Sequence, residues 1–528
     1  MFSFRVAGVV ALSALLVVAG GSAFASPASL GSGSTTGGTT VSGAVTGVTF
    51  TQVVAGVEHS LGIGSDGNAY AWGRGSDGQL GIGSSPTSSS VPVRVLAGAV
   101  PSGVTFVSVA AGTDFSLALG SDGNAYAWGR NSYGQLGDGS TTSSSVPVQV
   151  STGAVPSGVT LTSVAAGDNF SSAVGSDGNV YAWGNNGYGQ LGDGSTTSSS
   201  VPVQVSAGAV PSGVTLTSVA AGYFHLLALG TDGNAYAWGG NFEGQLGDGS
   251  TAQSLVPVQV SAGAVPSGVS FTSVDAAAKH SMALGSDGNV YAWGYNFYGW
   301  LGDGSTTSSL VPVQVSAGAV PSGVTFTSVA AGETHSLALG SDGNAYAWGS
   351  NFFGELGNNS TAQSSVPVLV STGAVPSGVT MSTVSAGPYY SLALGSDGNA
   401  YAWGDNDYGK LGDGSFLGRL QPVPVEHSVV ISGVSFDAVN GTGLTQSAGA
   451  WSIDTPAHSA GAVDVVVSYT QFGVASTQTF VGGFTYLALL AATGSPFPFL
   501  TAGSALLLLI VGSGFLVVRR AVAHRPTA

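Results

Sequence analysis

The sequence predicts an all-β protein whose main body is a seven-bladed β-propeller. A nine-residue stretch, "SDGNAYAWG" at 65–73, recurs in nearly the same form seven times. The copies begin at 65, 121, 176, 231, 286, 341 and 396, so the first step is 56 residues and every later step is 55. Each repeat holds four short strand-like segments and no amphipathic helical segment. Repeats of four antiparallel strands at such a period are typical of propeller blades.

The repeat that begins at Val324 illustrates the expected strands. Its segments 325–331 (TFTSVAA), 335–339 (HSLAL), 345–349 (AYAWG) and 365–370 (SVPVLV) are predicted to be the four strands in order. The "SDGN" between the second and third segments predicts a tight hairpin, because Asp-Gly supplies a residue with positive φ. The proline of the fourth segment cannot donate a ladder hydrogen bond, so this strand is expected at a sheet edge.

The tryptophan of each hairpin is predicted to pack between blades. A four-stranded blade has two half-buried faces, and a ring of seven blades buries these faces against neighbours. The tryptophans share one position of the repeat and are Trp72, Trp128, Trp183, Trp238, Trp293, Trp348 and Trp403.

Four sequence blocks recur in register over residues 48–428: "AGxxHSLAL", "DGxxYAWG", "GQLGDGS" and "PVxV". In this order they resemble the regulator of chromosome condensation repeat. The resemblance implies a seven-bladed propeller, in agreement with the count of repeats. Two segments, 42–50 and 423–436, resemble the junction between repeats, and either is expected to complete the closing blade. Residues 26–47 are therefore a linker with a possible closing strand.

The N-terminus predicts export. Arg5 precedes a short apolar run, and Ala23-Phe24-Ala25 has the pattern of a cleavage site, so residues 1–25 are predicted to be a signal peptide. An N-terminal membrane anchor is the less favoured alternative because the apolar run is short. The chain contains no cysteine, which excludes disulfides and thiolate chemistry.

The C-terminal segment 487–528 predicts anchoring at the cell surface. Residues 499–518 carry no charge and are long enough for a transmembrane helix, and three arginines follow. The pentapeptide before them resembles a sortase sorting signal of the Leu-Ala-x-Thr-Gly type; it consists of Leu490, Ala491, Ala492, Thr493 and Gly494. The resemblance implies cleavage by a sortase between Thr and Gly and attachment to the cell wall of a Gram-positive type of cell. A plain transmembrane anchor is the alternative.

Residues 429–486 follow the last repeat and alternate in the manner of short strands with Gly and Asn turns. The stretch "WSIDTPAHSAGAVDVVVSY" ending in "GGFTY" resembles immunoglobulin-like modules of the TIG type. The resemblance implies a small β-sandwich, which we expect to act as a stalk between propeller and wall.

The charge of the chain excludes one class of partner. The formal net charge is −16, and residues 26–494 carry all 26 acidic residues against six basic ones. Because such a surface repels phosphate backbones, nucleic-acid binding is not expected.

Two stretches of the repeat vary while the strands are almost copied. One follows each Ala-Gly pair; the other lies between Trp-Gly and Gly-Gln-Leu-Gly and reads RGSD, RNSY, NNGY, GNFE, YNFY, SNFF and DNDY. Aromatic and acidic residues on rigid loops suit binding of a protein surface. The candidate partner-binding residues are Tyr295, Phe297, Tyr298, Trp300, Phe352, Phe353, Tyr389, Tyr390 and Phe242. The alternative is that these rings pack beneath neighbouring blades.

No catalytic residue, metal site or cofactor is predicted. His59, His225, His280 and His335 share a position that holds Phe or Tyr in the other repeats, which indicates packing. Unit-specific acids Asp275, Glu333, Glu355 and Asp407 lie in different repeats, so a hydrolase with two converging carboxylates is not favoured. A calcium site at 405–414 lacks the full loop pattern.

The sequence therefore predicts a secreted, wall-attached, non-enzymatic scaffold for adhesion or protein recognition. Three alternatives stay open: a propeller that inhibits a β-lactamase, as some secreted members of the resembled family do, a wall-polysaccharide hydrolase, and a passive spacer.

Overall fold

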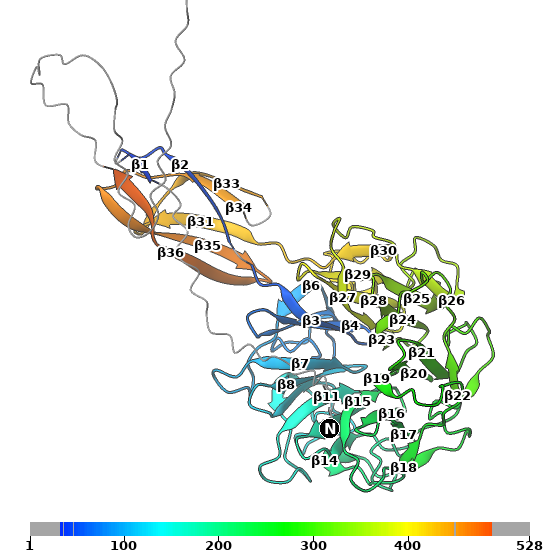
Figure 1. Ribbon diagram of the computed structural model, residues 1–528. Helices are drawn as coiled ribbons and strands as arrows, with labels where there is room; N and C mark the ends of the chain where they lie inside the picture. The colour runs from blue at the N-terminus through cyan, green and yellow to red at the C-terminus, as the bar shows by residue number, and fades with distance from the viewer. Residues whose placement is uncertain (1–31, 35, 46, 448–449, 488–528) are drawn as a thin grey trace, which may run out of the picture.

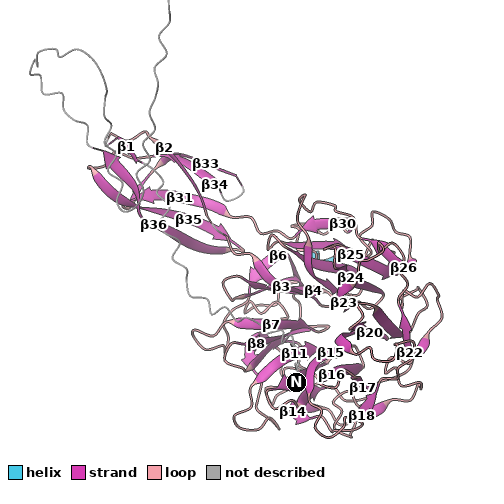
Figure 2. Ribbon diagram, in the orientation of Figure 1, coloured by secondary structure: helices cyan, strands magenta, loops and turns pink. Residues whose placement is uncertain are grey.

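The computed structural model describes residues 32–34, 36–45, 47–447 and 450–487. They form a ring of blades and an elongated module beside it (Figure 1). Nearly all regular structure is strand, as Figure 2 shows; the one helical segment among the described residues is the 3₁₀ turn η1 (Asp407–Gly409). An all-β fold is thus confirmed.

Seven four-stranded antiparallel sheets form the ring. The first, innermost strands of the blades are β3 (Phe50–Ala55), β7 (Phe106–Ala111), β11 (Leu161–Ala166), β15 (Leu216–Ala221), β19 (Phe271–Ala276), β23 (Phe326–Ala331) and β27 (Met381–Ala386). The second strands are β4 (His59–Gly64), β8 (Phe115–Gly120), β12 (Phe170–Gly175), β16 (His225–Gly230), β20 (His280–Gly285), β24 (His335–Gly340) and β28 (Tyr390–Gly395). The third are β5 (Ala69–Arg74), β9 (Ala125–Gly129), β13 (Val180–Gly184), β17 (Ala235–Gly239), β21 (Val290–Gly294), β25 (Ala345–Gly349) and β29 (Ala400–Gly404). The outer strands, which contain the proline, are β6 (Ser88–Arg94), β10 (Ser144–Gln149), β14 (Ser199–Gln204), β18 (Ser254–Gln259), β22 (Ser309–Gln314), β26 (Ser364–Leu369) and β30 (Arg419–Pro424).

The repeated "SDGNAYAWG" is explained residue by residue. In the first copy Gly67 takes φ +75° in the hairpin turn, and Asp66 accepts a hydrogen bond from the backbone N–H of Asn68. The same carboxylate accepts a 2.7 Å hydrogen bond from the hydroxyl of Tyr70, and this pair recurs in all seven blades. The stretch therefore fixes a turn and a buried tyrosine together.

The tryptophans seal the blade interfaces, as the sequence predicts. All seven are fully buried. Trp128 donates from Nε1 to the backbone oxygen of Gln79 in the preceding blade, at 2.8 Å, and every other interface has the equivalent bond. Gly81 of the same loop has φ +69°, and a Cβ there would lie 2.9 Å from Trp128 Nε1. The Gly-Gln-Leu-Gly block therefore binds the tryptophan of the next blade, and we call this contact the latch.

The ring closes differently from the prediction. Each blade takes all four strands from one repeat, so neither 42–50 nor 423–436 supplies a missing strand of a closing blade. The last blade meets the first through the same contacts as any other pair: Phe50 N donates to Gly398 O and Trp72 Nε1 donates to Lys410 O, both at 2.9 Å. Seven equivalent interfaces suffice because each repeat carries both the tryptophan and the loop that accepts its hydrogen bond.

The second module combines both ends of the described chain. Its strands are β1 (Ser32–Ser34), β2 (Thr40–Ala44), β31 (Val430–Phe436), β32 (Val439–Asn440), β33 (Thr442–Ser447), β34 (Ala450–Asp454), β35 (Gly461–Gln471) and β36 (Val474–Leu487). They form one sheet in the order β1-β36-β35-β31-β32 and another in the order β2-β34-β33. A shared apolar core that includes Val41, Trp451 and Phe484 lies between them. The segment expected to be a linker or closing strand is therefore part of this module.

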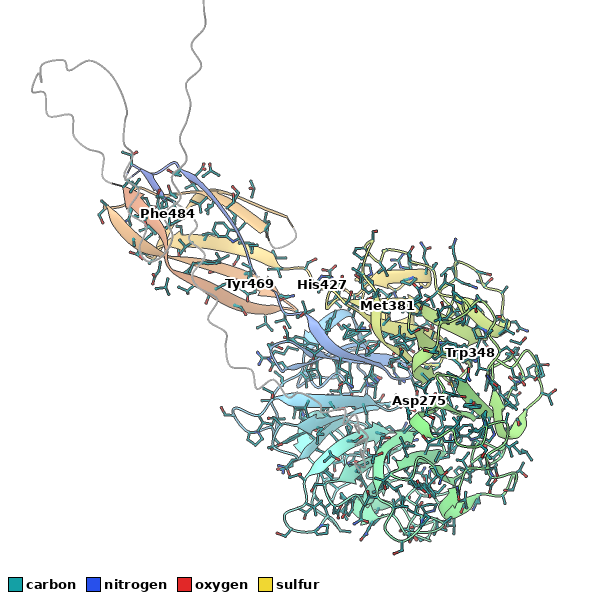
Figure 3. All side chains as sticks on the ribbon, viewed as in Figure 1. Asp275, Trp348, Met381, His427, Tyr469 and Phe484 are labelled. Atoms are coloured by element: carbon teal, nitrogen blue, oxygen red, sulfur yellow. The ribbon has the colours of Figure 1, made fainter. Side chains whose placement is uncertain are left out.

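The tip of the β35–β36 hairpin joins the module to the propeller. Gln471 accepts from Val48 N at 2.7 Å and donates to Val48 O at 3.0 Å. Phe472 packs on the rings of Tyr70 and Phe50, with centroid distances of 4.6 and 5.6 Å. Figure 3 shows the module side chains Tyr469 and Phe484, and His427 in the segment between the two bodies. The junction therefore fixes one end of the module on the first blade.

No helix among the described residues is long and apolar enough to cross a membrane. The predicted signal peptide, the pentapeptide Leu490 to Gly494 and the predicted transmembrane segment 499–518 all lie outside the described residues.

Candidate binding face

The two variable stretches of every repeat meet on one face of the ring. The first and third strands of an antiparallel blade run in the same direction, so the loops after them share a face. In the first blade Arg74 N donates to Glu58 O at 2.8 Å, and the equivalent backbone bond joins the two loops in all seven blades. We call this surface the variable face. The module junction lies at the start of the first strands, and hence at the opposite face.

An asparagine that recurs in six of the seven repeats holds the longer variable loop through side-chain hydrogen bonds. Asn131 accepts from Leu136 N and donates from Nδ2 to the backbone oxygens of Ser140 and Thr142, at 3.1–3.2 Å. The equivalent asparagines of blades three to seven make the same set; they are Asn186, Asn241, Asn296, Asn351 and Asn406. The side chain of this asparagine therefore holds the turn of the loop in six of the seven blades.

Aromatic side chains gather on blades three to seven of the variable face. We call them the aromatic arc: Tyr188, Phe224, Phe242, Tyr295, Phe297, Tyr298, Phe352, Phe353 and Tyr389. Phe297, Phe352 and Phe242 are 59, 58 and 53% exposed, and Phe353 and Tyr389 are 47 and 36% exposed. Tyr295 and Tyr298 are half-buried. Large rings this exposed on stiff loops are typical of interaction surfaces.

The rings of the arc support one another across blade boundaries. Tyr188 of the third blade packs edge-on against Phe242 of the fourth at 5.1 Å, and Tyr298 packs against Phe352 of the sixth at 5.4 Å. Phe353 contacts Tyr389 of the seventh blade at 5.2 Å. Such contacts hold exposed rings in defined positions, which lowers the entropy lost when a partner binds.

Two of the candidate residues do not belong to this surface. Trp300 is 5% exposed and Tyr390 is fully buried. Trp300 packs on His280 and Tyr295, with centroid distances of 5.6 and 4.9 Å. Tyr390 lies at the repeat position of the histidines, and its hydroxyl donates to His59 O at 2.8 Å across the closing interface. For these two residues the packing alternative is correct.

Blades one and two present mainly ion pairs, beside the exposed ring of Tyr133 on the second blade, which is 43% exposed. Arg74 contacts Glu58 at 3.1 Å and Asp114 at 3.2 Å, and Arg130 contacts the second oxygen of Asp114 at 3.3 Å. Arg74 also lies 3.3 Å from Asp77. The acids of this half are therefore neutralised by two arginines, whereas the arc half carries acids with fewer cations.

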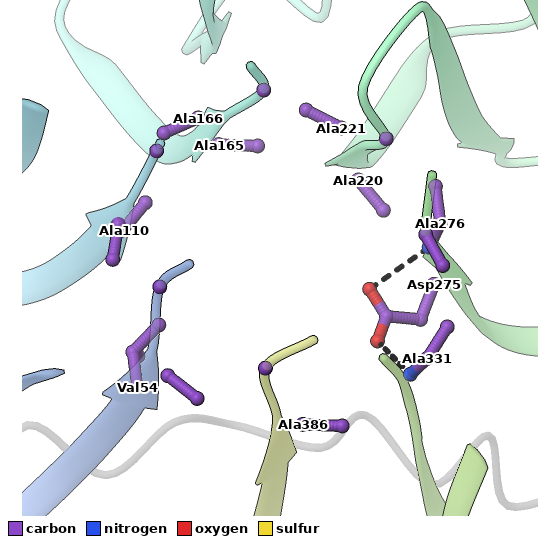
Figure 4. Close-up of a pocket in the computed structure, with 18 of the residues that line it drawn as sticks. Val54, Ala110, Ala165, Ala166, Ala220, Ala221, Asp275, Ala276, Ala331 and Ala386 are labelled. Carbon is purple, nitrogen blue, oxygen red and sulfur yellow. Dashed lines mark hydrogen bonds between the residues drawn. The ribbon is translucent and has the colours of Figure 1, made fainter. Parts of the chain in front are cut away.

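A cavity of about 280 Å³ lies at the centre of the ring, next to the arc. All seven blades contribute to its wall, mostly through Ala, Val and Gly of the first strands. Asp275 points into this space, as Figure 4 shows. Its two oxygens accept from Ala276 N at 3.0 Å and from Ala331 N of the next blade at 2.8 Å. Burial raises the pKa of Asp275 to about 6, against the two backbone donors, which lower it.

We call this cavity the central channel. Its opening, the channel mouth, lies on the variable face, and a hydrogen bond crosses it. Tyr223 of the fourth blade donates to Glu333 of the sixth at 2.8 Å, and both residues line the cavity. Burial raises the pKa of Glu333. The ring thus brings Asp275 and Glu333 to one cavity, although the sequence places them in separate repeats.

The buried histidines form hydrogen bonds between blades. His59, His225, His280 and His335 each place Nε2 within 2.8–3.0 Å of a serine hydroxyl of the next blade. Each serine donates its proton to a backbone oxygen, for example Ser116 to Gln79 O, so the imidazole Nε2 carries the hydrogen. Burial lowers the pKa of all four histidines to about 3. A neutral ring that donates to a fully buried serine cannot act as its general base, and the packing interpretation agrees with this geometry.

Two of the three carboxylates of segment 405–414 form ion pairs with basic side chains of the chain. Asp405 lies 2.6 Å from the buried ammonium of Lys410, and Asp413 lies 2.6 Å from Arg419. Both pairs orient these acids into the protein, so the segment functions as an ion-paired loop.

The sequence did not identify the central cavity or several members of the arc. Tyr188 and Phe224 were not among the candidates, although both lie in the variable stretches. The sequence could have identified both, because every residue of the variable stretches lies on one face once a ring of blades is assumed.

Known proteins share this architecture. A family model described as the RCC1-like domain matches residues 24–316 and, in a second match, 138–442. The ultraviolet-B receptor UVR8 of Arabidopsis thaliana is 32% identical over 398 residues, which are 75% of this chain and 86% of that protein. Human E3 ubiquitin-protein ligase HERC2 is 30% identical over 359 residues, 67% of this chain but only 7% of the ligase.

Two solved structures show the same fold. Yeast RCC1 (Prp20), crystallised bound to Kap60, aligns with a TM-score of 0.59 at 23% identity and covers 77% of this chain and 90% of its own. Human WBSCR16 aligns with a TM-score of 0.59 at 22% identity, covering 74% of this chain and 98% of its own. From the matched residues and the extent of the likeness to UVR8, the chain belongs to the RCC1-like domain family.

Proposed function

We propose that this protein is a non-enzymatic binding scaffold, exported and held at the cell surface, whose aromatic arc binds a protein partner. The observation that carries the proposal is the placement of the arc. Six of its rings are at least 36% exposed, and they lie on the face opposite the module junction. A partner can therefore approach the arc without meeting the module.

The module supports the anchoring part of the proposal. β36 starts at the hairpin tip on the propeller and runs for 14 residues, which is roughly 45 Å at a rise of about 3.3 Å per residue. Leu487, its last residue, pairs with Ser34 of β1, so both ends of the described chain leave at the far end of the module (Figure 1). A tail attached there holds the propeller away from the wall with the variable face outward. We propose that the module is an immunoglobulin-like domain of the TIG type and that it acts as a spacer between the propeller and the wall.

The partners named for related proteins indicate only the kind of molecule that this chain binds. Yeast RCC1 was solved with Kap60, and a second structure of that protein concerns its binding to Gsp1p and histones. These proteins bind other proteins, and we extend that general role to this chain. The ligase activity named for HERC2 is not extended, because this chain matches 7% of that protein.

The binding test replaces the three most exposed rings with the residue that two other blades carry. Phe242, Phe297 and Phe352 occupy the position of Ser76 and Ser132, so the triple change of each phenylalanine to serine keeps the loop compatible with the fold. Proteins retained by the immobilised wild-type chain from envelope and host extracts should be lost from the triple variant, because the three most exposed rings of the arc are removed.

The matched control lies on the rim of the seventh blade. Phe416 and Leu417 are 59 and 68% exposed, and the second blade carries Thr141 and Thr142 in their place. Phe416→Thr with Leu417→Thr should retain the same partners. Equal capture by the triple serine variant would remove the arc as the binding site.

Anchoring has its own test. Thr493→Ala removes the residue whose carbonyl a sortase would attack, so wall-linked protein should disappear and membrane-associated or released protein should increase. Unchanged wall linkage would contradict a sortase signal, whereas the binding proposal would stand.

A further inference from the structure

The channel mouth is the most negative part of the variable face. The variable stretches of all seven blades contain eight acids against three bases, a net charge of −5. The acids of blades one and two are paired with Arg74 and Arg130. The remaining charge is concentrated on the arc side, where Asp168 and Glu333 occupy the same repeat position at the rim of the channel.

Three carboxylates at this mouth form no ion pair among the described residues, and the groups that donate hydrogen bonds to them are neutral. Lys279 acts on Glu333 electrostatically but makes no direct contact with it. Asp168 accepts from the hydroxyl of Thr113 at 2.6 Å and from Asn169 at 2.7 Å. Glu333 accepts from Tyr223, and Asp275 accepts from two backbone N–H groups. By contrast, the part-buried Asp114, Asp405 and Asp413 each have a basic side chain within 3.3 Å. Unlike these three acids, the channel carboxylates have no basic side chain in direct contact among the described residues.

The fold does not require charge at these positions. The position of Asp275 holds Val54, Ala110, Ala165, Ala220, Ala330 and Ser385 in the other blades. Ser385 bridges to Ala55 N of the next blade at 3.0 Å, as Asp275 bridges to Ala331 N, but with a neutral hydroxyl. The bridge between blades is thus available without a carboxylate, and the negative charge of Asp275 is unexplained by packing.

The aromatic arc continues into the mouth. Tyr223, which lines the channel, contacts Phe224 of the arc at a centroid distance of 6.2 Å. On the other side Lys279 places its ammonium 5.4 Å from the ring centroid of Tyr295, so a cation already lies over a ring of this surface. Rings beside uncompensated carboxylates attract an organic cation through both charge and cation–π interaction.

We propose that the arc receives a protein segment with an exposed lysine or arginine flanked by apolar residues, and that this basic group enters the channel mouth between Asp168 and Glu333, toward Asp275. The inference rests on the proposed function and names the chemistry of its partner. The apolar residues of the segment cover Phe297 and Phe352, and its basic group neutralises the negative charge of the three acids. The surplus of negative charge also speeds the approach of such a segment.

Random 12-residue peptides displayed on phage, selected on the immobilised full-length protein at 0.15 M salt, test this chemistry. Selected peptides should carry Lys or Arg beside aromatic or apolar residues. A synthetic copy of the most enriched peptide should bind about tenfold more tightly than the same peptide with that basic residue changed to glutamine.

The protein side uses two variants and one control. Asp275→Ser copies the residue of the seventh blade, and Glu333→Gln keeps an acceptor for Tyr223. Together they should weaken the basic peptide about tenfold and leave the glutamine peptide unchanged, which is the coupling expected of a direct pair. Asp407→Asn removes one negative charge from an exposed site of the same face and should have little effect. Thermal melting of each variant confirms that it is folded.

The outcomes separate the two proposals. Peptides that lack basic residues but fail to bind the triple Phe→Ser variant would overturn the cation site and retain the arc as a binding face. Basic peptides whose affinity does not respond to Asp275→Ser with Glu333→Gln would also overturn the cation site. Peptides that bind the triple Phe→Ser variant unchanged would overturn the arc itself.

Discussion

His335 donates from Nε2 to Ser391 Oγ at 2.8 Å across the boundary between the sixth and seventh blades. Three more blade boundaries carry the same pair, and burial lowers the pKa of all four histidines to about 3. The unfolded chain titrates these groups near 6.5. Below pH 6.5 the unfolded state therefore binds more protons than the folded state, and stability falls as the pH is lowered toward 3.

This pH dependence is the first prediction. At pH 5 each buried histidine should lower the unfolding free energy by about 2 kcal/mol relative to pH 8. His280→Phe, which copies Phe115 and Phe170, should reduce the loss by about that amount in urea unfolding measured at both pH values. Asp275, with its pKa raised to about 6, contributes a smaller change of the opposite sign between pH 6 and 4. An unchanged pH slope in His280→Phe would contradict a neutral buried imidazole.

The blade architecture was predictable from the sequence because its signals are local. The Asp-Gly turn, the alternating strands and the proline edge all lie within one 55-residue repeat, and seven copies make the period visible. The closure of the ring was predicted wrongly because the sequence at 42–50 resembles a repeat junction. Thr40 pairs instead with Asp454, 414 residues away, and no local pattern reports such a pairing.

The candidate site was predictable in part. Variable loops identified Phe297 and Phe352 correctly as exposed, but Trp300 stands in a latch position where other blades carry a polar residue, and aromatic identity alone did not reveal its burial. The meeting of Asp275 and Glu333 was missed for a geometric reason. Residues in different repeats look distant along the chain, whereas a ring brings one repeat position from every blade to its centre.

Trp300 gives the second prediction. Gln79 and its equivalents cap the variable loop by accepting from a backbone N–H, as Gln135 does from Tyr133 N at 2.9 Å. Trp300→Gln restores this residue and should cost less unfolding free energy than Trp300→Ala, because four other blades pack a glutamine here: Gln79, Gln135, Gln190 and Gln245. Trp300→Ala leaves a cavity beside His280 and should cost about 3 kcal/mol or more. Denaturant unfolding distinguishes the two, and equal costs would mean that the site does not accept the common residue.

The junction gives the third prediction. Phe472, in the turn between β35 and β36, lies half-buried between Tyr70 and Phe50, while Val481 of β36 is 68% exposed. Phe472→Ala should release the module from the propeller and broaden the distance distribution in small-angle X-ray scattering, because the remaining amide contacts of Gln471 are few. Val481→Ala should leave the distribution as in the wild type. A rigid, unchanged particle in Phe472→Ala would show that Gln471 suffices.

The strand from the N-terminal segment gives the last prediction. Val41 is 3% exposed in the module core, whereas Ser42, the next residue of β2, points outward. Val41→Asp buries an unpaired carboxylate between the two sheets, which costs several kcal/mol and should melt the module. The propeller has its own seven cores and should keep its transition in calorimetry, so one transition of the wild type is lost or moved to low temperature. Ser42→Asp adds the same charge on the exposed side and should leave both transitions in place. If Val41→Asp melts like Ser42→Asp, then β2 does not belong to the module core, and residues 430–487 fold without the N-terminal segment.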